Sequence, residues 1–351
     1  MAGIYIHIPF CKQRCNYCNF YSIPVSRRNT KLKEYRSLFV NALLKEIQLQ
    51  KTYLENETVS TIYFGGGTPS LLTINEQDEI FNQIYKYFRI EKEIEVTLEV
   101  NPDDINIHML KALKKIPVNR MSIGIQSFFD EDLQYLSRVH NALQAINSIK
   151  LILDEGFNNL SVDLIYGIPS LTDERWLANL DFVLQYKIPH ISSYALTIEP
   201  KTTLEWLIRK GKIKAFDEQQ SIQQYRIMLD RFRNKGYVNY EISNFALKGK
   251  VSKHNCNYWK GIPYLGLGPS AHSFNRDSRQ WNVVNVSSYI TNLTKAEIPF
   301  EKEILNVEQK YNEYVMTSLR TVWGCDLQII INEFGIFYKD HFLQQIVRYL
   351  N

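Results

Sequence analysis

Short apolar or alternating runs recur along the first 200 positions, and longer stretches with apolar residues every three or four positions lie between them. Runs of the first kind are typical of β-strands, and a spacing near 3.6 is typical of amphipathic helices. Strands that alternate with helices predict parallel β–α–β units. The predicted strands are 4–8, 60–65, 94–100, 120–126, 160–167 and 190–199. The predicted helices are 31–51, 75–88, 130–156 and 173–187.

Residues that are suited to binding or catalysis come at or directly after the ends of these strands. In β/α barrels the functional groups gather at the carboxyl ends of parallel strands. Six such units predict an α/β fold, an open, partial (β/α)6 barrel of TIM type rather than a full eight-stranded one. The residues in question are Cys11, Gly65 to Gly67, Glu99, Gln126, Asp163, Gly167 and Tyr194.

The pattern changes near residue 210, and we predict three regions. Residues 1–212 form the partial barrel, and 213–299 form a connecting region that could bind substrate or haem. That region begins with a predicted helix at 216–236, followed by a loop-like stretch at 237–289 that is rich in glycine, asparagine and aromatic residues. Residues 300–351 are predicted as a smaller C-terminal α+β domain, mostly helical with short strands.

Composition bounds the class of protein. The 351 residues are 45% hydrophobic and 22% charged, which is typical of a soluble globular chain, and a net charge of +4 gives no indication of a nucleic-acid partner. No apolar run is long enough to span a membrane, and the N-terminus lacks the basic segment of a signal peptide. Three of five cysteines are clustered, which argues against a secreted disulfide framework and predicts a cytoplasmic location.

The clustered cysteines are Cys11, Cys15 and Cys18, in a C-x-x-x-C-x-x-C run. Three thiolates are one short of a closed zinc or ferredoxin-type site. A [4Fe-4S] cluster held by three cysteines would leave one iron open for a substrate or cofactor. The tight spacing favours this cluster over structural zinc and over plain thiols. A zinc site would need a fourth ligand from His7, Cys256 or Cys325.

The run from Cys11 to Cys18, with Tyr17 before the third cysteine, resembles the signature of radical SAM proteins. The resemblance implies that S-adenosylmethionine (SAM) occupies the open iron through its amino and carboxylate groups. It also implies that an electron from the cluster cleaves SAM to a 5′-deoxyadenosyl radical, while the protein positions both cofactors.

A glycine-rich turn, Gly65-Gly66-Gly67-Thr68-Pro69, follows the second predicted strand and resembles the SAM motif of the same family. Glycines let backbone amides approach a ligand closely. By themselves, three glycines would indicate only a turn between a strand and a helix. The turn is not a P-loop, because no Gly-Lys-Ser/Thr follows it.

Further segments resemble the HemN/HemW group, which comprises the oxygen-independent coproporphyrinogen III oxidase and its relatives. They include YIHIPFC, FGGGTPS, EVTLEVNP, RMSIGIQSF, LSRVH, VDLIYGIP, ISSYALTIEPKT and YEISNFA, and they follow one another along most of the chain. The resemblance implies SAM contacts at Tyr5, Tyr17, Gly66, Gly67, Thr68, Glu99, Gln126, Arg138 and Asp163.

These assignments are chemically reasonable. Carboxylates such as Glu99 and Asp163 can accept hydrogen bonds from ribose hydroxyls or an amino group. Arg138 can neutralise a carboxylate, and Tyr17 can lie against the adenine ring. Structural alternatives stay open: Arg138 as a charge on a helix surface, Glu99 as a helix cap and Tyr5 as a half-buried packing residue.

Two departures from the oxidase pattern favour the HemW branch of the group. The oxidase has a further cysteine two positions after the third, where this chain has Phe20, as the HemW branch does. The oxidase also carries an N-terminal extension that positions a second SAM and the substrate. Because the first predicted strand begins almost at the start of this chain, we expect no such extension here.

The segment KHNCNYWKG contains His254, Tyr258 and Trp259 in an H-N-x-x-Y-W arrangement that resembles a motif linked to haem binding in that branch. Imidazole is a common axial ligand of haem iron, and the two aromatic side chains could pack on a porphyrin. A hydrogen-bonded packing histidine is the structural alternative. Cys256 lies inside the motif, either as a bystander or as a second soft ligand, and we expect the former.

The resemblance therefore implies a haem chaperone that binds a [4Fe-4S] cluster, SAM and haem and transfers haem to haemoproteins. An electron donor such as flavodoxin and haem-accepting proteins, some of them membrane-associated, are the implied partners, and SAM cleavage would gate transfer or serve another reaction. The alternatives are the decarboxylating coproporphyrinogen III oxidase, a radical SAM methylase or cyclase, and a zinc protein without enzymatic activity.

Overall fold

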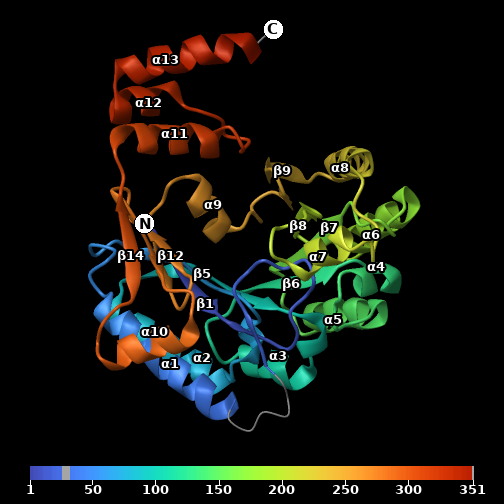
Figure 1. Cartoon of the computed structure of the whole chain (residues 1–351), viewed down its shortest axis with the longest axis horizontal. Coiled ribbons are helices and arrows are strands. Elements are labelled where there is room, and N and C mark those ends of the chain that lie inside the picture. Colours follow the sequence, from blue (N-terminus) through green and yellow to red (C-terminus); the bar gives the residue numbers. More distant parts are fainter. Residues whose placement is uncertain (26–31, 350–351) are drawn as a thin grey trace.

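The structure, a computed structural model, describes residues 1–25 and 32–349. One sheet of 12 strands runs through it, in the order β14-β13-β12-β11-β1-β4-β5-β6-β7-β8-β10-β9 (Figure 1). Its six middle strands pair in parallel in chain order, which confirms the partial (β/α)6 barrel and the six predicted strands. They are β1 (Ala2–Ile8), β4 (Val59–Gly66), β5 (Ile90–Val100), β6 (Arg120–Gln126), β7 (Leu160–Tyr166) and β8 (His190–Ala195).

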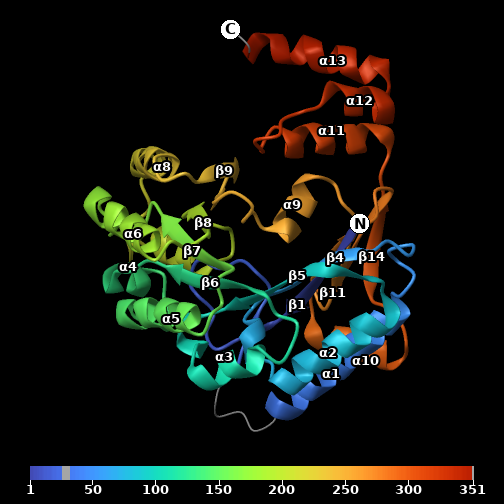
Figure 2. The same cartoon turned by 180° about the vertical axis from the view of Figure 1, so that it is seen from behind.

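The helices that connect these strands cover the outer face of the barrel (Figure 2). The predicted helices at 75–88, 173–187 and 216–236 correspond to α2, α6 and α8, and residue 31 of the first predicted helix lies outside the described residues. The helices are α1 (Leu32–Leu49), α2 (Ile74–Tyr87), α3 (Ile107–Leu113), α4 (Asp130–Tyr135), α5 (Ala142–Asp154), α6 (Asp173–Gln185), α7 (Thr203–Arg209) and α8 (Glu218–Arg233).

The prediction of one continuous helix at 130–156 is wrong, because the segment forms two helices, α4 and α5. Ser137 adopts a left-handed backbone conformation (φ 54°), which ends the first helical path. Asn141 then starts α5 through a capping box. Apolar spacing alone did not reveal this break, although both signals were local.

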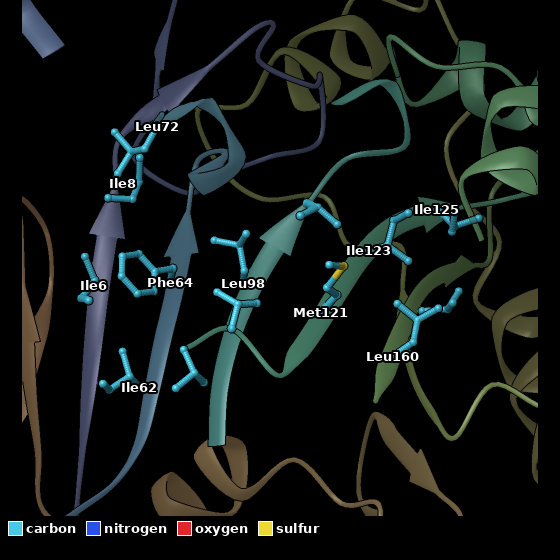
Figure 3. Packing of buried hydrophobic residues seen from close by; sticks show 14 of the residues in the cluster. Ile6, Ile8, Ile62, Phe64, Leu72, Leu98, Met121, Ile123, Ile125 and Leu160 are labelled. Carbon is cyan, nitrogen blue, oxygen red and sulfur yellow. The ribbon is translucent and has the colours of Figure 1, made fainter. Parts of the chain in front are cut away.

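Side chains on successive strand positions point to opposite faces, and the two faces of the barrel differ in chemistry. The inner face is polar and aromatic: Tyr5 lies beside Tyr63, and Glu99 beside Ser122, in the register of the sheet. The outer face is apolar and packs under the helices (Figure 3). The side chains labelled there are Ile6, Ile8, Ile62, Phe64, Leu72, Leu98, Met121, Ile123, Ile125 and Leu160.

The stretch at 237–289 is not loop-like as predicted, because it extends both edges of the barrel sheet. The strand β10 pairs with β8, and β11 pairs in parallel with β1. These strands have only three to five residues, so their pattern is too short to show a period. The elements are β9 (Val238–Glu241), β10 (Asn244–Ala246), α9 (Lys253–Trp259), β11 (Tyr264–Leu267), β12 (His272–Phe274), β13 (Ser278–Asn282) and α10 (Val286–Thr294).

The C-terminal region is mostly helical, as predicted, with residues 350–351 outside the described part. Its helices share a small core of their own around Tyr311, Ile330 and Phe342. They lie to one side of the sheet, and α9 lies between them and the barrel (Figures 1 and 2). None of the described helices is both long and apolar enough to cross a membrane. The elements are β14 (Phe300–Ile304), α11 (Val307–Ser318), α12 (Leu327–Phe334) and α13 (Ile336–Ile346).

The predicted region boundaries at residues 212 and 299 stay predictions. What the structure adds is that the strands of the connecting region belong to the same sheet as the barrel. The change in pattern near residue 210 thus coincides with a change from parallel to antiparallel pairing at the β8 edge of the sheet.

A buried carboxylate joins the barrel to this extension. Glu46 on α1 is fully buried and accepts hydrogen bonds from the Tyr289 hydroxyl (2.5 Å), the Asn282 side-chain amide (2.5 Å) and the Gly268 backbone amide (2.8 Å). Burial raises the pKa of Glu46 to about 7. Three buried donors thus hold this carboxyl group in place.

Replacing Glu46 with alanine is expected to lower the free energy of unfolding by about 3 kcal/mol, because three buried donors would lose their acceptor. Urea denaturation measures this loss. The matched control is Glu79→Ala on α2, where the side chain is exposed and the expected change is within about 0.5 kcal/mol. Equal stability of the two variants would show that the three contacts contribute nothing.

Candidate functional site

The three clustered cysteines lie on one loop, between the end of β1 and the short strand β3 (Ile23–Pro24). Cys11 ends the two-residue strand β2 (Phe10–Cys11), which pairs with β3, and the Cys18 amide donates to the Cys15 carbonyl (3.3 Å). Burial raises the pKa of Cys11 and Cys18, and the neighbouring Cys15 adds to both shifts because nearby thiolates repel. All three side chains are half-buried. The loop thus brings three thiols together.

The residues considered as a fourth zinc ligand have other contacts. Both ring nitrogens of His7 are hydrogen-bonded, to the Tyr5 hydroxyl (3.2 Å) and the Tyr21 carbonyl (2.9 Å). Cys256 packs against Tyr240 in a separate small core. In the described part of the chain, no three His, Cys, Asp or Glu side chains converge on a position for a single metal ion. This applies to Cys11, Cys15 and Cys18 as well, so it does not distinguish zinc from an iron–sulfur cluster.

Two polar side chains donate hydrogen bonds to these sulfurs. The buried Thr68 hydroxyl donates to Cys11 Sγ (3.5 Å), and Arg138 Nη1 donates to Cys15 Sγ (3.4 Å). Asn101 connects the two, since its amide donates to Thr68 Oγ1 (3.0 Å) and its oxygen accepts from Arg138 Nη2 (2.7 Å). Hydrogen bonds to the sulfurs are one way in which proteins tune iron–sulfur clusters.

The glycine turn packs directly against the cysteine loop. The Gly67 amide donates to the Ile8 carbonyl (2.7 Å), and a Cβ at Gly67 would lie only 2.6 Å from the Phe10 carbonyl oxygen. Gly66 has a φ of +104°, a conformation that side chains rarely adopt, and its Cβ would meet the His7 ring. A Cβ atom at Gly66 or Gly67 would clash, so glycine is required at both positions for the turn to lie this close to the cysteine loop. The turn and the thiols are consequently held as one unit at the carboxyl ends of β1 and β4.

Two carboxyl groups face the barrel interior beside this unit. Tyr63 donates to Glu99 (2.7 Å), and Ser122 donates to Asp163 (3.2 Å). Burial raises the pKa of Glu99 to about 7 and that of Asp163 to about 6, and the charge of Asp163 adds to the shift of Glu99. Glu99 lines an interior cavity of about 220 Å³, together with Tyr5 and Tyr63.

Comparison with known proteins agrees with this geometry. Residues 5–183, which include the thiols, the glycine turn and both carboxyl groups, match the family model of the radical SAM superfamily. The chain is a radical SAM protein of the HemN/HemW group. It is 32% identical over 337 residues to a Bacillus subtilis protein named heme chaperone HemW, covering 95% of this chain and 87% of that one. A Lactococcus lactis protein of the same name is 30% identical, with 99% and 89% covered.

A solved structure shares the fold. Coproporphyrinogen III oxidase (HemN) from Escherichia coli superposes with a TM-score of 0.84, and the match covers 99% of this chain and 83% of that one. At 23% sequence identity this similarity shows a common radical SAM fold and nothing about the reaction.

The donor set fits the cofactors of radical SAM proteins. A [4Fe-4S] cluster needs thiolates that surround it, and Cys11, Cys15 and Cys18 provide three on one half-buried loop. The glycine turn beside them leaves no room for a side chain. The Arg138 Nε atom is buried without a hydrogen-bond partner among the described residues, and it is available to an anionic ligand group.

The remaining predicted SAM residues lie around the same end of the radical SAM barrel. Gln126 follows a bulge at the end of β6 and has a left-handed φ of 69°, a strained conformation that is often found at functional sites. Tyr17 neighbours Arg138, and burial raises its pKa. Although burial opposes the charge of Arg138, Tyr17 and Cys15 raise its pKa above the ordinary value.

The motif around His254 lies at the opposite end of the radical SAM barrel. The His254 ring contacts Gly3 and Thr61, near the starts of β1 and β4, whereas the thiols follow the end of β1. Gly3 lies five residues before Ile8, the last residue of β1, which corresponds to about 16 Å. The motif thus approaches the barrel interior from the end opposite the thiols, and His254 and Tyr258 line the interior cavity together with the predicted SAM residues Tyr5 and Glu99.

Both ring nitrogens of His254 are engaged. Nδ1 is hydrogen-bonded to the Thr61 hydroxyl (2.8 Å) and Nε2 to the Tyr258 hydroxyl (2.9 Å). The ring stacks on Tyr63 with centroids 5.1 Å apart, and burial lowers the pKa of His254 to about 3. Its role as a haem ligand stays a prediction, and iron coordination would require one of these hydrogen bonds to break.

Asn101 and Tyr63 were not among the predicted SAM contacts. Asn101 bridges the donors to Cys11 and Cys15, and Tyr63 holds Glu99. The sequence contained a pattern that could have identified both residues. Asn101 lies directly after the third predicted strand, and Tyr63 lies two positions before Gly65, so strand alternation directs its side chain to the same inner face.

Proposed function

We propose that this chain holds a [4Fe-4S] cluster through Cys11, Cys15 and Cys18, binds SAM beside it, and acts as a haem chaperone. The observation that supports the haem role is the nearly full-length similarity to proteins named heme chaperone HemW. Haem and haem-accepting proteins are the proposed partners, an electron donor such as flavodoxin is the proposed reductant, and the cytoplasm is the proposed location.

For SAM, the chain contributes positioning and charge. Arg138 pairs with the SAM carboxylate, while Glu99 and Asp163 accept hydrogen bonds from its amino group or ribose hydroxyls. When bound, the cluster supplies one electron to SAM. The backbone around Gly66 and Gly67 limits the space beside the thiols. The proposed SAM contacts are Tyr5, Tyr17, Gly66, Gly67, Thr68, Glu99, Gln126, Arg138 and Asp163.

For haem, the motif residues His254, Tyr258 and Trp259 are the proposed contacts. Tyr258 and Trp259 end α9 on the side that faces the C-terminal helices. His254 supports Tyr258 through its hydrogen bond. If His254 coordinated the haem iron through Nε2, its hydrogen bond to the Tyr258 hydroxyl would be lost.

Haem transfer by the protein loaded with its cluster tests the function. The protein is reconstituted anaerobically, given haemin, and mixed with an apo-haemoprotein whose holo spectrum is followed. Faster gain of that spectrum than with free haemin in a protein-blank control supports a chaperone. Conversion of coproporphyrinogen III to protoporphyrinogen IX in the presence of SAM and a reductant would instead establish the oxidase, and no transfer with no conversion would refute the haem role.

The affinity for SAM is expected to fall as the pH is lowered from about 8 to about 5. The pKa is about 7 for Glu99 and about 6 for Asp163, so both are ionised at the upper end and neutral at the lower end. Only the ionised forms attract the SAM amino group. Equilibrium dialysis of SAM against the reconstituted protein measures the loss, expected at about tenfold or more.

A Glu99→Gln variant provides the control, because it removes the upper of the two titrations. Its affinity is expected to be weak already at about pH 8 and to decline only near the pKa of Asp163. A flat profile for the wild-type protein would show that neither carboxyl group contacts a charged part of SAM.

A further inference from the structure

A second and larger cavity lies on the far side of α9 from the barrel interior. It has a volume of about 890 Å³, within the usual range for ligand pockets, whereas the interior cavity beside Glu99 has about 220 Å³. The end of α9 forms one wall, strands β11 to β13 form the floor, and α11, α12 and the loop between them form the opposite wall. Figure 1 shows α9 between the C-terminal helices and the sheet. Of these two cavities in the described part of the chain, the larger one suits a ligand of drug size.

The walls of this cavity are rich in aromatic rings that can stack on a flat ligand. Trp323, in the loop between α11 and α12, is 46% exposed, and the Val322 amide anchors its loop to the Tyr240 carbonyl (3.0 Å). Trp259, the last residue of α9, lines the same cavity with a half-buried ring. The other aromatic lining residues are Tyr258, Tyr264, Phe274, Tyr314 and Phe334.

One cation in the lining is available to an acidic ligand. The Lys260 ammonium lies over the Trp323 ring, 4.4 Å from its centroid, and no carboxylate of a described residue lies within ion-pair distance of it. The other lining cations are already paired: Arg279 with Glu313, Arg276 with Glu57, and Lys310 with Asp277. A free ammonium group at the edge of an aromatic slot suits a flat ring that carries a carboxylate.

We propose that this cavity binds the tetrapyrrole ring of haem, which packs against Trp323 and Trp259 while the Lys260 ammonium moves from the Trp323 ring to a propionate. The proposal rests on the haem function proposed above and extends it from Trp259 of the motif to Lys260 and Trp323, which lie outside the motif. Iron coordination by His254 is not required, because that ring stays in its hydrogen bonds on the barrel side of α9. Tyr258 lines both cavities and separates them.

The larger cavity and the cysteine loop lie near opposite ends of the central strands. The cavity lies beyond the amino-terminal ends of β1 and β4, while the thiols and the glycine turn lie beyond the carboxyl ends. Haem bound there is separated from the interior cavity beside Glu99 by Tyr258, which lines both cavities. Haem in the larger cavity thus lies outside the barrel interior, on the other side of Tyr258 from Glu99.

Binding titrations on the full chain with its cluster test the proposal. Haemin is followed by its Soret band, and metal-free protoporphyrin IX by its fluorescence, with the wild type, Trp323→Ala and Lys260→Gln. Because ring stacking and the propionate contact do not involve iron, each substitution is expected to weaken both ligands about fivefold. Cluster content and SAM binding confirm that each variant is folded.

The chain offers a matched control. Trp206 on α7 is 40% exposed and carries Lys212 over its ring at 4.7 Å, which is the same pair of residue types outside this cavity. Trp206→Ala is expected to leave both affinities unchanged. Lys260 is exposed, so Lys260→Gln remains informative even if Trp323→Ala destabilises the C-terminal helices.

The outcomes separate this proposal from the haem function itself. Wild-type affinity for both ligands in Trp323→Ala and Lys260→Gln would overturn the location while haem binding stands. Weakening of haemin alone, with metal-free protoporphyrin IX unaffected, would show that iron coordination decides binding and would also overturn it. Failure of the wild-type protein to bind haemin would refute the haem function together with this site.

Discussion

Replacing Cys15 with alanine is expected to abolish the iron–sulfur cluster. Three thiolates leave no ligand to spare, and Cys15 is the thiol that also accepts a hydrogen bond from Arg138 (3.4 Å). With two thiols the loop cannot retain a [4Fe-4S] cluster, so the iron content after anaerobic reconstitution is expected to fall from about four atoms per chain to near zero. Iron analysis and the visible absorption of the protein measure the loss.

Cys325→Ser is the matched control for this experiment. Cys325 is also half-buried and free, but it packs among the C-terminal helices, and its thiol is directed at the Val315 carbonyl (3.9 Å). Its replacement is expected to leave iron content and colour unchanged. Full iron loading of Cys15→Ala, or equal losses in both variants, would contradict a cluster held by Cys11, Cys15 and Cys18.

The barrel could be predicted from the sequence because its signal is local. Each central strand is buried on its outer face, so apolar residues such as Ile6 and Ile62 recur along it, and the helices between the strands show a regular apolar spacing. The residues at the strand ends then share one edge of the sheet by topology alone. Cys11, Gly67 and Glu99 were placed together in this way.

The remaining structure depends on contacts between distant residues. Thr61 and His254 are 193 positions apart, and their hydrogen bond fixes α9 under the barrel. The strands β9 to β13 are too short to show a period, and their pairing with β8 and β1 makes them strands. No local pattern indicates that His254 is enclosed or that Trp323 faces α9. The motif therefore predicted haem contacts on α9, which stay a prediction, and gave no indication of the larger cavity beside that helix.

Replacing Arg138 with methionine is expected to weaken SAM binding more than any other single change outside the cysteines. Arg138 donates to Cys15 Sγ, to Asn101 Oδ1 (2.7 Å) and to the Gly124 carbonyl (2.8 Å), and its buried Nε has no partner among the described residues. Methionine keeps much of the volume but removes the charge and every donor. Truncating one partner of a buried charged contact typically costs about 2 kcal/mol or more, which is roughly 30-fold in Kd.

Equilibrium dialysis of SAM against the cluster-loaded variants measures this effect, and Arg138→Lys is the control. Lysine restores the charge but cannot donate in a fork to Cys15 and Asn101 at once, so its affinity is expected to lie between those of methionine and arginine. If charge alone attracted the SAM carboxylate, lysine would match the wild type. If Arg138 served only to hold the loop between α4 and α5, both variants would lose iron in step with SAM, because the contact to Cys15 would be lost in each. Weak SAM binding with iron content intact is the result that assigns Arg138 to the ligand, and wild-type affinity in Arg138→Met would remove it from the site.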